Sequence, residues 1–297
     1  MSTLDTPRLV APPGACDCHM HVFEPHFGAS VNPAFVPPQA SATQYLQMRQ
    51  SLGLERVVVV QANCYGLDNR GMLEAMATFG EGARGVAVVA PDVAAAELQR
   101  LTDLGVRGVR FHMLAGGALQ WPQLDEVVAR VQPFGWHVQV QLDGCQLPGH
   151  VQRLRDLPVD CVIDHLGKFI DPGPPQPGDP AFRALLALLD GGHCWVKLSA
   201  PYESSRRAAP DYADLTPLAR ALISSHPERC LWASNWPHPM RTPRPADAAL
   251  LDLLLDWAID DRTRQRILVD NPAVLYGFDR PAQRPVPTPP QHNGTPR

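Results

Sequence analysis

One pattern of apolar and polar positions repeats along most of the chain. Between residues 14 and 280, amphipathic stretches with apolar residues at helical spacing end at Gly or Pro, and a short β-branched run follows each of them. Examples are QYLQMRQSLGLERVVVV, LQRLTDLGVRGVRF and LLALLDGGHCWVKLS. Helical periodicity, a stop signal and then a strand are typical of β/α units whose strands run parallel.

The pattern predicts eight strands. They are expected near residues 15–20, 56–62, 85–90, 106–112, 137–142, 160–165, 194–199 and 230–235. Eight β/α units in roughly 265 residues is the size of a (β/α)8 TIM barrel, a fold of the α/β class. A doubly wound open sheet is the alternative, but no glycine-rich phosphate fingerprint follows the first strand.

The two ends of the chain differ from its middle. Residues 1–13 are expected to form an N-terminal extension and residues 14–279 the barrel. Proline is frequent in the whole chain, with 32 residues, and it is dense in RPAQRPVPTPPQHNGTPR at 280–297. A segment of this composition cannot bury a core, so a disordered tail is predicted there.

Composition excludes several classes of partner. With 45% hydrophobic and 19% charged residues and a net charge of −4, the chain lacks a basic field for nucleic acid. It has no apolar run of membrane-spanning length and no signal-peptide pattern, which predicts a cytoplasmic protein without membrane contact. The seven cysteines are interpreted as reduced thiols rather than a disulfide framework. The oligomeric state stays open, a homo-oligomer included.

Polar residues alternate along the first predicted strand, in the stretch ACDCHMHVF at 15–23. Since successive side chains of a strand point to opposite faces, Asp17, His19 and His21 are predicted to share one face. The other face would then carry Cys16, Cys18 and Met20. Two histidines one residue apart can hold a metal or move protons, so this pair raises the question of which chemistry it serves.

The same alternation sorts the side chains of the later strands. In the fifth strand, Val138, Val140 and Leu142 form an apolar face that should meet the helices. The sets predicted to share an inward face are Arg110 and His112 in the fourth strand, His137, Gln139, Gln141 and Asp143 in the fifth, Cys161, Ile163 and His165 in the sixth, Trp195, Lys197 and Ser199 in the seventh, and Leu231, Ala233 and Asn235 in the eighth.

These polar residues lie toward the C-terminal ends of their strands, where barrel enzymes keep their active sites. One cleft is therefore predicted to gather His19, His21, Arg110, Asp143, His165, Lys197 and Asn235. A single histidine at a strand end is usually structural, but burying many ionisable groups in one place is costly unless they act together. Four other histidines are interpreted as structural or surface residues, namely His112, His137, His193 and His226.

Three motifs carry a family resemblance across almost the whole chain. DCHMH at 17–21, IDHLGK at 163–168 and LWASNWPHP at 231–239 resemble the amidohydrolase superfamily. The branch that they resemble contains D-galactarolactone isomerase and 2-pyrone-4,6-dicarboxylate lactonase. Further stretches with the isomerase pattern are LAGGAL at 114–119, QLDG at 141–144, DHLGKF at 164–169 and YESSR at 202–206.

The resemblance implies a site without metal or other cofactor. Metal-holding members of the superfamily use the first-strand histidine pair, a fourth-strand lysine or acid, histidines after strands five and six, and an eighth-strand aspartate. This chain has Arg110 and Asn235 where the fourth-strand ligand and the aspartate would stand. Three neutral histidines beside a guanidinium, without that carboxylate, make a poor divalent-metal site.

Asn235 points to isomerisation rather than hydrolysis. In the lactonase pattern an eighth-strand aspartate activates water, and an amide has no basic lone pair for that task. An engineered Asp-to-Asn replacement would leave the same residue. The resemblance implies an enzyme that interconverts 1,4- and 1,5-lactones of a sugar acid with a free carboxylate. The hypothesis for its mechanism is that His165 and one of His19 or His21 exchange the proton-transfer roles, while Asn235 donates a hydrogen bond.

Substrate contacts follow from the same resemblance. Arg110 and Arg206 match carboxylate-binding arginines of the branch, and guanidinium groups bind carboxylates in a bidentate manner. Tyr202 and Asp143 are further candidate contacts. The lactonase pattern has another arginine where this chain has AGG at 115–117, which favours a substrate with one carboxylate.

Other functions stay open at the level of sequence. A lactone hydrolase is the main alternative. Lys197 at the end of the seventh strand would allow a Schiff-base lyase. A metal-dependent decarboxylase of the broader superfamily and a binding protein without catalysis complete the alternatives.

Overall fold

The computed structural model describes residues 6–24, 26–28, 37–207 and 209–279. Eight parallel strands pair in chain order, each with the next, so the (β/α)8 barrel predicted from the sequence is confirmed. The strands are β1 (Cys16–Met20), β2 (Arg56–Val60), β3 (Ala83–Ala87), β4 (Val106–His112), β5 (His137–Gln141), β6 (Cys161–Ile163), β7 (Cys194–Leu198) and β8 (Cys230–Trp232).

Hydrogen bonds between the ends of β1 and the segment after β8 close the ring. The backbone N–H of Asn235 donates to the carbonyl of His19 at 2.9 Å, and the N–H of His21 donates to the carbonyl of Trp236 at 2.8 Å. A parallel bridge joins Met20 to Trp236. Closure brings the first and last strands side by side, so residues more than 200 positions apart can share one site.

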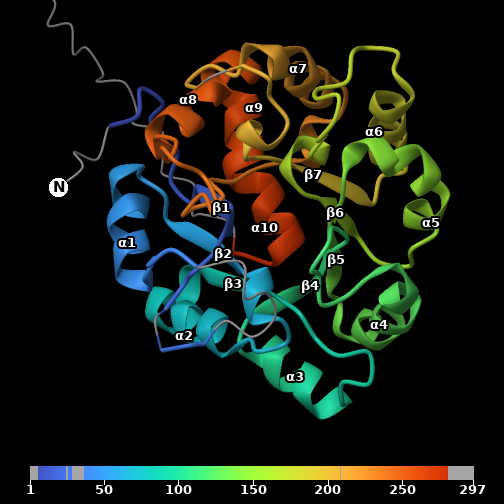
Figure 1. Ribbon diagram of the computed structural model, residues 1–297. Coiled ribbons are helices and arrows are strands. Elements are labelled where there is room, and N and C mark those ends of the chain that lie inside the picture. Colours follow the sequence, from blue (N-terminus) through green and yellow to red (C-terminus); the bar gives the residue numbers. More distant parts are fainter. Residues whose placement is uncertain (1–5, 25, 29–36, 208, 280–297) are drawn as a thin grey trace, which may run out of the picture.

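Helices surround the barrel, except that α10 lies across its middle in this view (Figure 1). They are α1 (Ala42–Ser51), α2 (Arg70–Phe79), α3 (Ala95–Asp103), α4 (Leu124–Val131), α5 (Val151–Arg155), α6 (Pro180–Asp190), α7 (Thr216–Ser225), α8 (Asp247–Trp257), α9 (Asp261–Gln265) and α10 (Asn271–Tyr276). A capping box fixes the start of α1, because Ser41 accepts from the N–H of Gln44 and the Gln44 side chain accepts from the N–H of Ser41.

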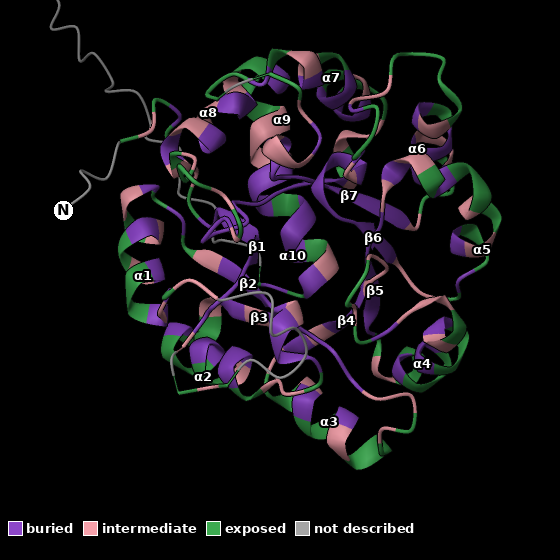
Figure 2. Cartoon of the chain, in the orientation of Figure 1, coloured by how far each residue is buried: buried purple, intermediate pink, exposed green. Residues whose placement is uncertain are grey.

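The core has two parts, an outer cluster between strands and helices and an inner cluster inside the barrel. Figure 2 shows the strands buried along their lengths. The inner cluster joins apolar side chains of the strands to Tyr276 and Phe278, at and beyond the end of α10. The predicted faces of three strands are confirmed, since Val138 and Val140 lie in the outer cluster while Trp195 and Leu231 lie in the inner one.

The predicted faces of β1 were right for His19 and His21, which lie side by side, and wrong for Asp17, Cys16 and Cys18. Asp17 pairs with Val57 and Met20 with Val59, so three steps along β1 match two along β2, which is a β-bulge. Asp17 consequently points out of the barrel and accepts a hydrogen bond from the Tyr45 hydroxyl of α1 at 3.0 Å, and Met20 packs in the outer cluster. The inward residues of β1 and its continuation are Cys16, Cys18, His19 and His21.

The predicted faces of β6 were also wrong. Cys161 and Ile163 belong to the outer cluster, and Val162 belongs to the inner one. The strand ends at Ile163, and the next inward side chain is Asp164. His165 reaches the cleft because its backbone turns there to a φ of 57°, not because it continues the alternation of the strand.

All seven cysteines are free thiols, as the sequence predicted. Among the described residues, no helix combines the length and the apolar character needed to cross a lipid bilayer. In the expected N-terminal extension, Arg8 and the N–H of Leu9 contact the carboxylate of Asp252 on α8. The tail predicted at 280–297 lies outside the described residues.

Candidate active site

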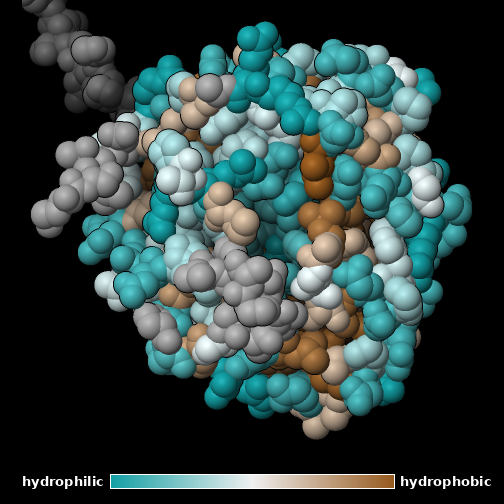
Figure 3. Space-filling view, in the orientation of Figure 1, coloured by the Kyte–Doolittle hydropathy of each residue, from teal (hydrophilic) through white to brown (hydrophobic). Residues whose placement is uncertain are grey.

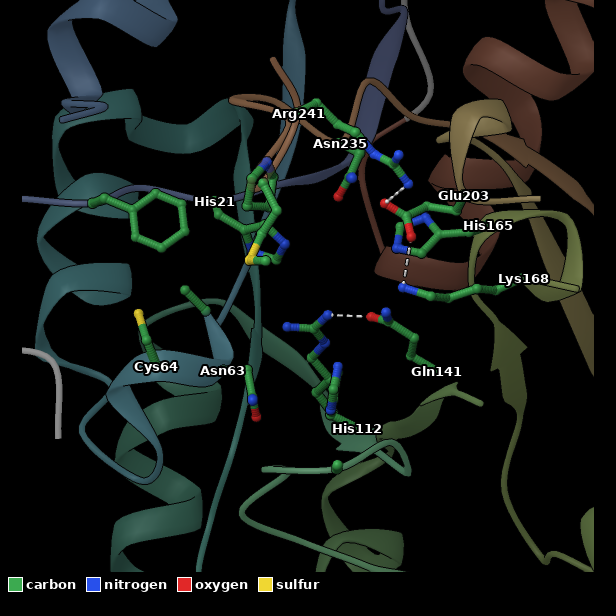
Figure 4. A pocket seen from close by; sticks show the side chains of 16 residues that line it. His21, Asn63, Cys64, His112, Gln141, His165, Lys168, Glu203, Asn235 and Arg241 are labelled. Atoms are coloured by element: carbon green, nitrogen blue, oxygen red, sulfur yellow. Dashed lines mark hydrogen bonds and ion pairs between the residues drawn. The ribbon is translucent and has the colours of Figure 1, made fainter. Parts of the chain in front are cut away.

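A cleft of about 500 Å³ opens at the C-terminal mouth of the barrel, where barrel enzymes have their active sites. Figure 3 shows a hollow with hydrophilic walls on this face of the molecule. Its polar wall is formed by His21, Asn63, Arg110, His112, Gln141, His165, Lys168, Glu203, Asn235 and Arg241 (Figure 4).

The histidine pair at the end of β1 and just after it, His19 and His21, occupies two different depths. His21 lines the cleft, whereas His19 is fully buried beneath it. Nδ1 of His21 lies 2.8 Å from the carbonyl of Val60, and a carbonyl only accepts, so this nitrogen carries the proton. In a neutral His21, Nε2 therefore accepts from Nε2–H of His19 across 3.1 Å.

A buried ammonium group completes the hydrogen bonds of His19. Lys197 Nζ lies 2.5 Å from Oε1 of Gln139, 3.3 Å from Nδ1 of His19 and 3.5 Å from Oδ1 of Asp164. Nδ1 of His19 also lies 3.2 Å from Oδ1 of Asp164, which only accepts. Because the proton of His19 is on Nε2, toward His21, Nδ1 is left to accept from Lys197, and the three protons of Lys197 meet three acceptors. The second oxygen of Asp164 accepts from the amide of Gln139 at 3.0 Å. The group is a closed network in which every member has a partner.

Charge pairing decides the ionisation of Asp164. Burial alone would raise the pKa of this carboxyl, but the positive charges of Lys197 and Arg110 and the hydrogen bond from Gln139 outweigh burial and lower it below its ordinary value. For Lys197, burial dominates and lowers the pKa of the ammonium group, while Asp164 opposes the shift. Asp164 was missed in the sequence, although it stands in the quoted motif IDHLGK.

His165 presents one nitrogen to the cleft. Its Nδ1 lies 2.9 Å from the hydroxyl of Ser199 at the end of β7, which orients the ring. Burial, together with nearby cations such as Lys168 and Arg110, lowers the pKa of His165 well below 6.5. Burial and Arg110 also lower the pKa of His21 to about 3. Both imidazoles are therefore neutral at neutral pH and can accept a proton.

Asn235 is held by a chain of side chains behind it. Its Nδ2 donates to the hydroxyl of Tyr202 at 2.9 Å, and that hydroxyl lies 3.0 Å from Nδ1 of His238. Nε2 of His238 lies 3.0 Å from Asp247, so this nitrogen donates to the carboxylate and Nδ1 accepts from Tyr202. Asn235 lines the cleft, and its second amide proton has no partner among the described residues. Its left-handed backbone, with a φ of 60°, suits asparagine better than most residues.

Three cations and one carboxylate line the described wall of the cleft. Arg110 donates to the carbonyl of Gln61 at 2.8 Å and to Oε1 of Gln141 at 2.6 Å, both neutral groups. Glu203 bridges the other two cations, at 2.9 Å from Nζ of Lys168 and 3.1 Å from Nη2 of Arg241. The positive charge of Arg110 is therefore the one without a carboxylate in direct contact.

The structure brings His21, Arg110, His165 and Asn235 together, but it places three expected substrate contacts elsewhere. Arg206 turns outward with its side chain 57% exposed and contacts the carbonyl of Ile170 and the carboxylate of Asp171. Asp143 caps the short helix after β5 and accepts from the N–H groups of Cys145 and Ile170. Tyr202 lies behind Asn235.

Several cleft residues were not singled out in the sequence. His112 lines the cleft, although it was interpreted as structural, and the alternation rule had already placed it beside Arg110. Lys168 and Glu203 stand in the quoted motifs IDHLGK and YESSR, which was the signal that could have found them. Arg241 lies in the loop after β8 and carries no signal of spacing or periodicity.

The other histidines that were interpreted as structural lie away from the cleft. His137 is buried inside the barrel, where its ring lies edge-on to Tyr276. His193 contacts backbone carbonyls, and His226 pairs with Asp190. None of the three lines the cleft wall described above.

One set of side chains could hold a metal among the described residues. The ligand atoms of His19, Asp164 and His165 lie within 4.8 Å of one another. However, the ammonium group of Lys197 already contacts both His19 and Asp164, and Arg110 adds a further positive charge to the same region. A divalent ion would have to displace or face these cations, so the donor set fits a metal poorly.

Comparisons with known proteins show the family of the chain. The Amidohydrolase family model matches residues 16–278. The chain is 37% identical to D-galactarolactone isomerase of Agrobacterium fabrum, over 91% of this chain and 93% of that protein. It is 36% identical to 2-pyrone-4,6-dicarboxylate hydrolase of Comamonas testosteroni, over 91% and 92%. A solved apo structure from Agrobacterium tumefaciens superposes with a TM-score of 0.87 at 36% identity, covering 93% of this chain and all of that one.

Proposed function

The chain belongs to the amidohydrolase family, and within it we propose an enzyme that interconverts the 1,4- and 1,5-lactones of a carboxylated sugar acid without a metal. The similarity to D-galactarolactone isomerase supports this class of substrate. The observation that carries the proposal is the pairing of a neutral imidazole, His165, with an amide, Asn235, in the cleft. A base is present for a sugar hydroxyl, but the position of a water-activating carboxylate holds an amide.

Arg110 is proposed to bind the free carboxylate of the substrate. Its guanidinium group is fixed by Gln61 and Gln141, and among the described residues no carboxylate contacts its charge directly. A substrate carboxylate would supply the missing counter-charge through charge-assisted hydrogen bonds. The lactone ring would then lie over His21 and His165, which line the same cleft.

Isomerisation needs a proton to move between two substrate oxygens. In the proposed step, Nε2 of His165 takes the proton of the attacking hydroxyl while that oxygen forms the new C–O bond to the carbonyl carbon. The protonated His165 then returns the same proton to the ring oxygen as the old ester C–O bond breaks, so the imidazole ends neutral and no water is consumed. Ser199 orients the ring for this transfer. His21 is the second candidate proton carrier, because it lines the cleft whereas His19 lies beneath it.

The tetrahedral intermediate carries negative charge on the former carbonyl oxygen. The free amide proton of Asn235 is proposed to stabilise that oxyanion, since its other proton is engaged with Tyr202. Tyr202 acts through Asn235 in this scheme, and Asp143 and Arg206 are given no contact with the substrate. His112 and Lys168 remain for contacts with the hydroxyls of the sugar acid.

A lactone hydrolase is the second candidate function, and the similarity to 2-pyrone-4,6-dicarboxylate hydrolase supports it. A Schiff-base lyase has less support, because Lys197 is buried beneath His19 and does not line the cleft. A metal-dependent decarboxylase also has less support, because the positive charges of Lys197 and Arg110 oppose the binding of a divalent ion. The seven free thiols support the reducing cytoplasm as the compartment.

One experiment separates isomerisation from hydrolysis. The purified protein is mixed with D-galactaro-1,4-lactone in chelator-treated buffer made with oxygen-18 water, and NMR and mass spectrometry follow the products. The proposal expects the 1,5-lactone to appear first and without label, because no water enters the product. If labelled open acid is the first product and no second lactone forms, the chain is a hydrolase instead.

A further inference from the structure

Glu203 is the one carboxylate on the described wall of the cleft. It lies in the short helix Pro201–Glu203 after β7, and its side chain is 17% exposed. Figure 4 shows it between Arg241 and Lys168, with a contact to each. No step of the proposed isomerisation uses this carboxylate, although it faces the space that the substrate would occupy.

Glu203 is ionised at neutral pH. Burial alone would raise the pKa of this carboxyl, but Lys168 and Arg241 outweigh burial and lower it below its ordinary value. The carboxylate therefore occupies donors of both cations. Without it, Lys168 and Arg241 would present a second cationic site on the same cleft wall as Arg110.

The two cations have other supports besides Glu203. The guanidinium group of Arg241 lies 5.0 Å from the centre of the Tyr202 ring, and Lys168 follows directly from the turn that carries His165. A neutral side chain of the same shape at position 203 should thus leave both cations at the cleft. The negative charge itself is then the feature that such a substitution removes.

We propose that Glu203 is a charge filter that makes the cleft selective for ligands with a single carboxylate. This inference rests on the proposed function. Arg110 binds the one free carboxylate of the lactone, while Glu203 repels a second carboxylate and engages the cations that would otherwise bind it. The filter discriminates against the open dicarboxylate that hydrolysis of the lactone would produce, and against dicarboxylate lactones.

The test compares two open six-carbon acids that differ by one carboxylate, galactarate and galactonate. Dissociation constants of both are measured by calorimetry for the wild-type protein and for Glu203→Gln at low and high salt. Removing a unit charge about 6 Å from the second carboxylate, at an effective dielectric of about 40, should raise affinity for galactarate relative to galactonate by roughly tenfold. High salt should shrink that ratio.

Two further variants separate charge from structure. Glu203→Asp keeps the charge and should keep the wild-type ratio, whereas Glu126→Gln removes a charge from an exposed position on α4 and should not change it. Equal changes for both acids in Glu203→Gln would overturn the filter and leave a structural bridge. A variant that still fails to bind galactarate would overturn it as well. Neither acid contains a lactone, so these outcomes are independent of whether the protein isomerises or hydrolyses lactones.

Discussion

Replacing Asn235 by aspartate tests the proposed chemistry most directly. The amide now donates one proton to the hydroxyl of Tyr202 at 2.9 Å and keeps the other for the cleft. A carboxylate in the same place would exchange an oxyanion donor for a base that can activate water. Isomerisation should therefore fall in Asn235→Asp, while hydrolysis should rise.

The size of both effects follows from the surroundings of position 235. Loss of one oxyanion donor costs about 10²–10³-fold in rate. A positioned general base contributes about 10²–10⁴-fold, and the lower end applies here because Arg110 and Arg241 on the same wall would reduce the basicity of the carboxylate. The ratio of hydrolysis to isomerisation should thus increase by about 10⁴-fold or more.

The assay follows a galactarolactone in oxygen-18 water and measures unlabelled lactone and labelled open acid by mass spectrometry. Asn235→Ala serves as the matched control, because it removes the donor and adds no base. If Asn235→Asp incorporates no more label than Asn235→Ala, position 235 does not govern the entry of water, and the reasoning from amide to isomerase fails. Thermal melting of both variants shows whether either change acts through folding.

Three further outcomes are expected. Arg110→Met should lower kcat/KM for a carboxylated lactone by about 10²-fold, because about 2–3 kcal/mol of charged hydrogen bonding is lost. Arg206→Met is the control and should change kcat/KM less than about twofold, because that side chain faces solvent. Burial lowers the pKa of His165 well below 6.5, and a base must be neutral to act. The value of kcat/KM should therefore stay level as pH falls from 8 to about 6. A decrease of kcat/KM toward low pH with its midpoint at 6.5 would contradict this role. Gly108→Ala would place a Cβ 2.4 Å from the His137 ring and should lower the free energy of unfolding by about 1–3 kcal/mol, so an unchanged denaturant midpoint would refute the packing argument.

The fold could be predicted because each β/α unit repeats the same local signals. Helical spacing, a stop residue and a β-branched run are properties of neighbouring positions, and eight repetitions leave few architectures to consider. The inward faces of β5, β7 and β8 followed from strict alternation for the same reason. In β5 the apolar and polar residues fall on opposite faces, and in β7 and β8 the inward faces join apolar residues deep in the barrel to polar residues near its mouth.

The prediction of the β1 faces failed because contacts with residues distant in the sequence determine which way its side chains point. In DCHMH, the polar residues alternate perfectly, and nothing local indicates a bulge. The bulge turns Asp17 toward Tyr45 on α1 and toward Ser234, whose N–H and hydroxyl both donate to its carboxylate. Four hydrogen bonds to a buried carboxylate, one of them from the N–H of His19, are possible only in the closed barrel.

The site was predicted in part for a related reason. Strand alternation identified Arg110 and Asn235, whose positions depend on single strands and the turns that follow them. Arg206 and Asp143 lie in loops, where the direction of a side chain depends on which backbone groups the loop offers it, and both found partners in the segment around Ile170. Arg241 reaches the cleft from a loop as well, and its pairing with Glu203 could be seen only in the folded structure.

The buried network explains how two neutral imidazoles can keep a fixed direction for proton transfer. Nε2 of His19 carries the proton that faces His21, and its Nδ1 accepts from Lys197, 3.3 Å away. The carbonyl of Val60 holds the proton of His21 on Nδ1, so Nε2 of His21 is the acceptor. The tautomers of His19 and His21 are therefore fixed by the ammonium group of Lys197 and the carbonyl of Val60, neither of which contacts the substrate in the proposed scheme. Asp164 balances the charge of Lys197, and the tautomers at the cleft thus depend on an ion pair that lies beneath it.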